Sequence, residues 1–110
     1  MSKIIESPVK KFPGTVTVPD DLDYSQGVKY VTAYREAKAL GEAATMIEFV
    51  YTMMPAICYC VEKWELTGLP SQVTPEVLEK AKPGRAVAAL MSWLFQETTV
   101  LYSRTEVPND

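Results

Sequence analysis

The sequence predicts a mainly α protein, a small helical bundle with three substantial helices, one short helix and an extended N-terminal arm or short β element. Three observations support this fold class. Apolar residues recur at spacings of three and four between residues 46 and 64 and again between 85 and 102. Residues typical of helix starts and ends separate these stretches. Thr15-Val16-Thr17-Val18 shows the two-residue alternation of a half-buried strand.

The N-terminal arm is expected to cover residues 1–22, followed by a helical domain over 23–103 and a polar tail over 104–110. Within the arm, Pro13-Gly14 is a turn dipeptide that could close a hairpin between residues 9–12 and 15–18. No later segment offers the strand an obvious partner. The strand is therefore expected to pair with a local hairpin arm, with the body of its own chain or with another chain.

The helix boundaries follow from capping residues. Asp23 with Gln26 has the form of a capping box and predicts a first helix that ends near Gly41. Thr74-Pro75 predicts the start of a short helix over 75–81, and the last helix is expected over 85–102. The long second helix carries Pro55, at which it either kinks or breaks. Its apolar stripe consists of Ile47, Val50, Met54, Ile57, Val61 and Trp64.

Composition excludes several classes of function. The chain has 110 residues, a hydrophobic fraction of 47% and a net charge of −3, which argues against disorder and against a general nucleic-acid binder. There is no histidine, the commonest general base and metal ligand. The apolar run over residues 46–61 is too short and too mixed for a membrane span. We therefore expect a soluble, intracellular, non-enzymatic protein without cofactor or metal.

The cysteines and carboxylates support the same expectation. Cys58 and Cys60 point to different sides of a helix, so they are expected to be reduced core residues. Asp23 is expected to cap a helix, with solvated acidic neighbours. Glu48 is expected either to point outward or to pair with Arg35 or Arg85. The remaining acids of interest look like solvated helix faces, namely Glu62, Glu65, Glu76 and Glu79.

Apolar and methionine-rich surfaces are the remaining candidates for function. Four methionines lie on apolar stripes, namely Met46, Met53, Met54 and Met91. Core filling is the default interpretation of these flexible side chains, and a groove for a partner helix is the sharper alternative. We expect a partner protein and self-association into a homo-oligomer, with neither nucleic acid nor membrane as a partner. The predicted partner-binding residues are Phe12, Val16, Val18, Met46, Phe49 and Met53.

Three segments resemble the tail assembly chaperones of long-tailed bacteriophages. These are Phe12-Pro13-Gly14-Thr15-Val16-Thr17-Val18-Pro19 running into Leu22, then Trp64-Glu65-Leu66-Thr67-Gly68-Leu69-Pro70, and the closing helix over 86–102. The resemblance implies a small, acidic, mostly helical protein of the host cytoplasm that holds the tail tape-measure protein and assists tail-tube assembly. The alternative is a small phage-type inhibitor or adaptor that binds a host protein through an acidic helical surface.

Overall fold

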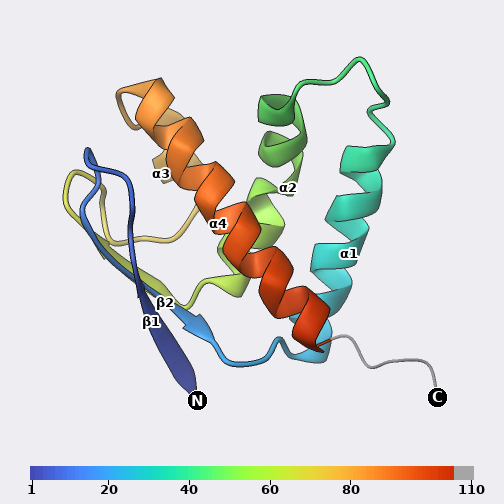
Figure 1. Cartoon of the computed structure of the whole chain (residues 1–110), viewed down its shortest axis with the longest axis horizontal. Helices are drawn as coiled ribbons and strands as arrows, with labels where there is room; N and C mark the ends of the chain where they lie inside the picture. The colour runs from blue at the N-terminus through green and yellow to red at the C-terminus, as the bar shows by residue number, and fades with distance from the viewer. Residues whose placement is uncertain (106–110) are drawn as a thin grey trace.

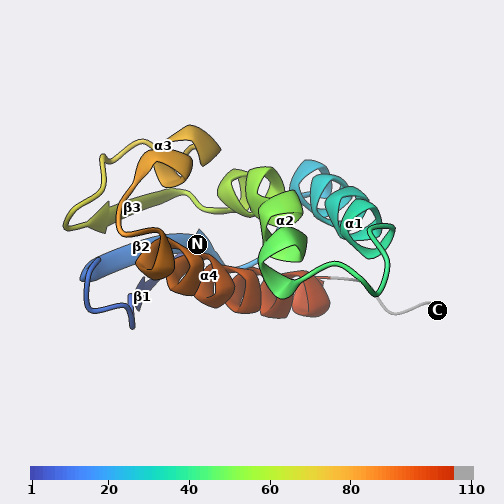
Figure 2. The ribbon, with the colours of Figure 1, turned by 90° about the horizontal axis from the view of Figure 1, so that it is seen from above.

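The computed structural model describes residues 1–105, which form a mixed α/β fold rather than the mainly α bundle that the sequence predicted. In chain order the elements are β1 (Ser2–Glu6), β2 (Gly14–Pro19), α1 (Tyr24–Lys38), α2 (Met46–Cys60), β3 (Lys63–Leu66), α3 (Pro75–Lys80) and α4 (Gly84–Thr105). The sheet occupies one end of the molecule and α1 the other, and α4 extends from one end toward the other (Figures 1 and 2). The predicted tail from residue 106 onward lies outside the described residues.

The N-terminal arm is part of this fold because β2 is the central strand of an antiparallel sheet with the order β1-β2-β3. Val16 lies opposite Ile5 of β1 and Trp64 of β3. The hairpin partner of β2 is therefore residues 2–6, not 9–12. The prediction that no later segment pairs with β2 was also wrong, since β3 lies more than forty residues further along the chain.

Gly14 allows β2 and β3 to approach closely at the start of their pairing. Its φ of +138° lies in the region that favours glycine, and a Cβ atom at this position would overlap the carbonyl oxygen of Glu65. The predicted turn dipeptide thus lies at the start of β2, where Thr67 donates its backbone N–H to the carbonyl of Pro13.

The helix starts agree with the capping signals. The side chain of Asp23 accepts from the backbone N–H of Gln26 and completes the predicted capping box of α1. The Thr74 hydroxyl caps α3 by accepting from the backbone N–H of Val77. Of the two alternatives for Glu48, the outward one is confirmed, because Glu48 is exposed and its carboxylate accepts from the backbone N–H of Thr45 in the capping box of α2.

Helix α2 continues through Pro55 without a break and ends at Cys60. The predicted apolar stripe extends further, to Trp64, but this residue belongs to β3. The alternation of Lys63, Trp64, Glu65 and Leu66 between exposed and buried is that of a strand with one face on the core. The Trp64 indole N–H donates to the carbonyl of Pro70 at 2.8 Å.

The core lies between one face of the sheet and the helices. Its largest fully buried side chains come from the sheet and its preceding loop (Phe12, Val16, Trp64), from α2 (Met53, Ile57, Cys60), from α3 (Leu78) and from α4 (Leu90, Leu94, Thr98). Hydrogen bonds join α1 to α4, where the Tyr30 hydroxyl lies 2.9 Å from the Thr98 hydroxyl and 2.8 Å from the Thr99 hydroxyl. The helices therefore cover the inner face of the sheet, whereas on the outer face Ile4 is exposed and Thr17 of the central strand is buried.

Candidate functional site

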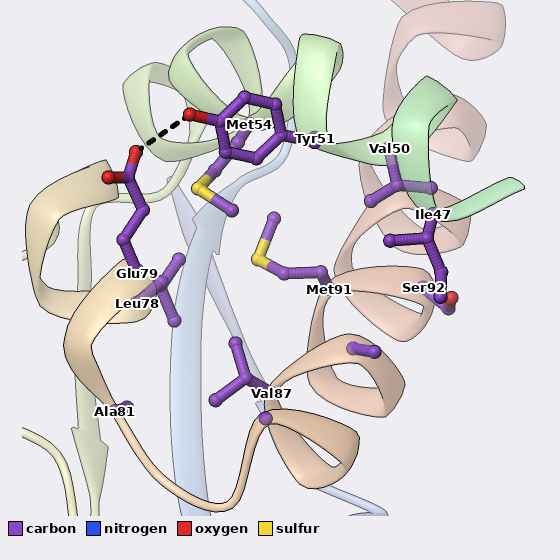
Figure 3. A pocket seen from close by; sticks show the side chains of 12 residues that line it. Ile47, Val50, Tyr51, Met54, Leu78, Glu79, Ala81, Val87, Met91 and Ser92 are labelled. Atoms are coloured by element: carbon purple, nitrogen blue, oxygen red, sulfur yellow. Dashed lines mark hydrogen bonds between the residues drawn. The ribbon is translucent and has the colours of Figure 1, made fainter. Parts of the chain in front are cut away.

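The candidate site is a groove bounded by α2, α3 and α4, with a volume of about 400 Å³ (Figure 3). We call it the α2–α3–α4 groove. Helix α2 contributes Ile47, Val50, Tyr51 and Met54 to its lining. Helix α3 contributes Leu78 and Glu79, and Ala81 follows α3 directly. Helix α4 contributes Gly84, Val87, Ala88, Met91 and Ser92. The groove brings together one side of three helices that are separate in sequence.

Capping residues set where the helices that form the groove walls begin. Thr45 begins α2 with the capping box described above, and Ile47 and Tyr51, four residues apart, lie on one side of its first turns. Thr74 and Pro75 begin α3, which carries Leu78 and Glu79 of the facing wall. The caps thus define the individual helices, whereas the packing of α3 beside α2 brings the two walls together.

The floor of the groove is buried, whereas its rim is open to solvent. Met54 and Met91 are 6% and 2% exposed, and their side chains extend into the space between α2 and α4 (Figure 3). On the rim, Ile47 is 68% and Tyr51 57% exposed. Large apolar side chains held in solvent above an apolar floor are typical of binding surfaces.

Glu79 is the one charged residue among those that line the groove. It is exposed at the rim, where the Tyr51 hydroxyl donates to its Oε2 atom at 3.4 Å (Figure 3). A carboxylate beside an apolar surface can accept hydrogen bonds from a lysine or arginine of a bound molecule. The groove therefore has the chemistry to recognise apolar side chains together with one cation.

The six predicted partner-binding residues do not form one surface. Phe12, Val16, Val18 and Met53 are at most 2% exposed, because the sheet and the helices cover them, and in this fold they offer no surface to a second chain. Phe49 is half-buried, with its ring in edge contact with those of Tyr34 and Phe95. Only Met46, at 63% exposure, is open to solvent.

The two thiols are buried and free, as predicted. Burial raises the pKa of each, Cys58 and Cys60, from 9.0 to about 12. A thiol is a nucleophile or metal ligand only as the thiolate, so both side chains act as small apolar groups at neutral pH. The described residues contain no cluster of three acids or cysteines that could hold a metal ion.

The four acids of the alternative prediction are all exposed, but they lie on two elements and alternate with lysines. Glu62 and Glu65 flank Lys63 at β3, and the Glu62 carboxylate accepts from the Ser2 hydroxyl at 2.6 Å. Glu76 and Glu79 lie on α3, which ends with Lys80. The charge of this region is therefore mixed rather than uniformly acidic.

None of the residues that line the groove was among the six predicted partner-binding residues. The spacing of Ile47 and Tyr51, four apart at the start of a helix, was the available signal for its rim. Met54 and Met91 were noted as methionines on apolar stripes without being assigned to one site. Glu79 was predicted only as part of a solvated or acidic helix face, because nothing in the sequence places α3 beside α2.

Within the described part of the chain, no helix combines the length and apolar content of a bilayer span. Comparison with models of protein families, with curated proteins and with solved structures found no match. The geometry of the groove is therefore the basis for assigning a function.

Proposed function

We propose that this chain is a non-enzymatic protein-binding protein that holds an apolar helical segment of another protein in the α2–α3–α4 groove. The observation that carries the proposal is the contrast between the exposed rim residues Ile47 and Tyr51 and the buried floor formed by Met54 and Met91. Grooves of this kind bind the apolar face of an amphipathic helix.

The groove can bind apolar side chains of different shapes. Methionine side chains adapt to differently shaped apolar groups, so Met54 and Met91 can accept leucine, isoleucine or phenylalanine side chains of a partner. The carboxylate of Glu79 at the rim favours a partner segment that carries a lysine or arginine beside its apolar residues. A chaperone that holds several segments of one long protein requires this combination of adaptability and modest selectivity.

Within this class, the resemblance of three segments to those of tail assembly chaperones favours a role in bacteriophage tail assembly. The partner would be the tape-measure protein, whose apolar helical segments would occupy the groove in the host cytoplasm until the tail tube forms around them. Binding would then be driven mainly by burial of apolar surface.

The proposal is tested with the full chain and overlapping peptides that cover a tape-measure protein, with fluorescence anisotropy as the measurement. Ile47→Ala and Tyr51→Ala should each weaken the binding of the best peptide about fivefold or more, the effect of removing a contact worth about 1 kcal/mol. Val100→Ala is the matched control, since Val100 is 53% exposed on α4 but does not line the groove. Peptide binding that survives both groove substitutions would contradict the proposal.

Salt dependence separates this proposal from an inhibitor that binds through an acidic surface. Apolar burial in the groove should change little between low and high salt, apart from the small contribution of Glu79. Binding of a host protein through Glu62, Glu65 and Glu76 should weaken steeply with added salt and should tolerate Ile47→Ala. Together these two results would identify the charged surface, rather than the groove, as the functional site.

A further inference from the structure

Strand β1 has one open edge, and its register defines which backbone groups lie on that edge. Ser7 donates its backbone N–H to the carbonyl of Gly14, and Asp20 donates to the carbonyl of Met1. These bonds, together with the pairing of Ile5 with Val16, place the odd-numbered residues of β1 in the hydrogen-bonded pairs with β2. The backbone N–H and C=O groups of Ser2, Ile4 and Glu6 therefore point away from β2.

Among the described residues, no strand pairs with this outer edge, since the sheet order is β1-β2-β3. Ile4 lies at the centre of the strand and is 68% exposed. It occupies the outer face of the sheet together with its pairing partner Thr17, whereas Ile5 packs against the core. The unpaired backbone groups of an open strand edge are a template for pairing with another strand, and an exposed isoleucine at its middle adds apolar surface to the contact.

The geometry points to a second copy of this chain as the partner of β1, joined antiparallel about a two-fold axis at Ile4 to give a continuous six-stranded sheet. In this arrangement Ile4 lies opposite Ile4 of the other copy, and Ser2 lies opposite Glu6. All three outward-facing residues of each strand then form backbone hydrogen bonds across the junction. The inference is independent of the proposed function, because β1 does not line the α2–α3–α4 groove.

Charge distinguishes this register from its neighbours. In the register centred on Ile4, Lys3 lies opposite Ile5 of the second copy. A shift that centres the axis on Lys3 would place two lysines directly opposite each other, which is destabilising, and a shift toward Ile5 would leave Ser2 without a partner residue. The self-complementary register is thus the one that uses the whole strand without opposing like charges.

A junction of two five-residue strands is small, so the dimer is expected to be weak and reversible. Sedimentation velocity over a wide concentration range should show the sedimentation coefficient of the full chain rising with concentration. A coefficient that stays at the monomer value at the highest concentrations reached would overturn the inference.

Because residue 4 faces its own copy, opposite charges at this position give a sharp test. Ile4→Lys and Ile4→Glu should each abolish self-association, since each places like charges opposite each other, while an equimolar mixture should associate again. Unchanged thermal unfolding confirms that each variant is folded, as expected for an exposed side chain. Self-association by either single variant at the wild-type level, or a mixture that stays monomeric, would contradict pairing through β1.

Amide hydrogen exchange locates the junction independently of mass. The amides of Ile4 and Glu6 should exchange rapidly in dilute protein and slowly in concentrated protein, whereas those of Lys3 and Ile5 should be protected in both. Ile47→Ala provides the matched control, because a groove substitution should leave this pattern unchanged. Concentration-dependent protection of groove residues without protection of Ile4 would place the contact elsewhere and overturn the inference.

Discussion

The two halves of α2 are both apolar, but the first turn of the helix is covered much less than the last turn. In the first half, Ile47 and Tyr51 are 68% and 57% exposed, whereas in the second half Ile57 and Cys60 are completely buried. The last turn leads directly into β3, whereas the first turn follows the loop after α1 (Figure 1). The comparison shows that an apolar stripe identifies the inward side of a helix, but not how far along the helix that side is covered.

The largest difference between the halves should appear in stability. Ile57→Ala removes a fully buried side chain and leaves a cavity, so it should lower the free energy of unfolding by about 2–5 kcal/mol. Urea unfolding followed by circular dichroism measures the change. A loss below about 1 kcal/mol would mean that the second half is less tightly packed than its burial indicates.

Alkaline pH should act on the second half through its thiols. Because burial raises the pKa of Cys58 and Cys60 from 9.0 to about 12, the unfolded chain releases these protons first. Stability is therefore retained below pH 9 and lost progressively between about pH 9 and pH 12, on the order of 1 kcal/mol per thiol at pH 10.

Urea unfolding at pH 8 and pH 10 tests this expectation. The Cys58→Ala/Cys60→Ala double variant is the control, because it lacks the pH-dependent contribution of the thiols to stability but keeps that of the tyrosines. The wild-type chain should lose more stability over this interval than the double variant. Equal losses in the two proteins would indicate that the thiols ionise in the folded chain at their ordinary pKa.

The smallest effect on stability is expected in the first half. Ile47→Ala makes the same chemical change as Ile57→Ala, ten residues earlier in the same helix. The free energy of unfolding should change by no more than about 0.5 kcal/mol, because the lost contacts are few and alanine favours the helix. Urea unfolding of the two variants side by side provides the comparison, and a loss at residue 47 similar to that at residue 57 would show that the rim is structural.

The sequence predicts local features of this fold better than its long-range pairings. Asp23 and Thr74 identify two helix starts because a cap acts on backbone groups within three residues. The sheet was missed because Trp64 continues the three-and-four spacing of α2, so that a four-residue strand was taken as the end of a helix. The pairing of β2 with β3 spans more than forty residues and depends on packing that no local pattern reports.

For the candidate site too, local features were predicted from the sequence and long-range contacts were not. A methionine-rich apolar surface was predicted, but four of the six assigned residues belong to the core. Val16 and Phe12 look available only while the arm is considered alone, since the partners that cover them come from elsewhere in the chain. Glu79 and Leu78 enter the site only through the packing of α3 beside α2, which the sequence does not specify.

Pro55 interrupts the backbone hydrogen bonding of α2 at the boundary between its two halves. Proline has no backbone N–H to donate to the carbonyl of Tyr51, so the helical hydrogen bond between these two residues is absent. The burial of Met53 and Met54 therefore holds the helix together across this gap. The exposed first turn of α2 is thus anchored by side chains in the core as well as by the backbone of the helix.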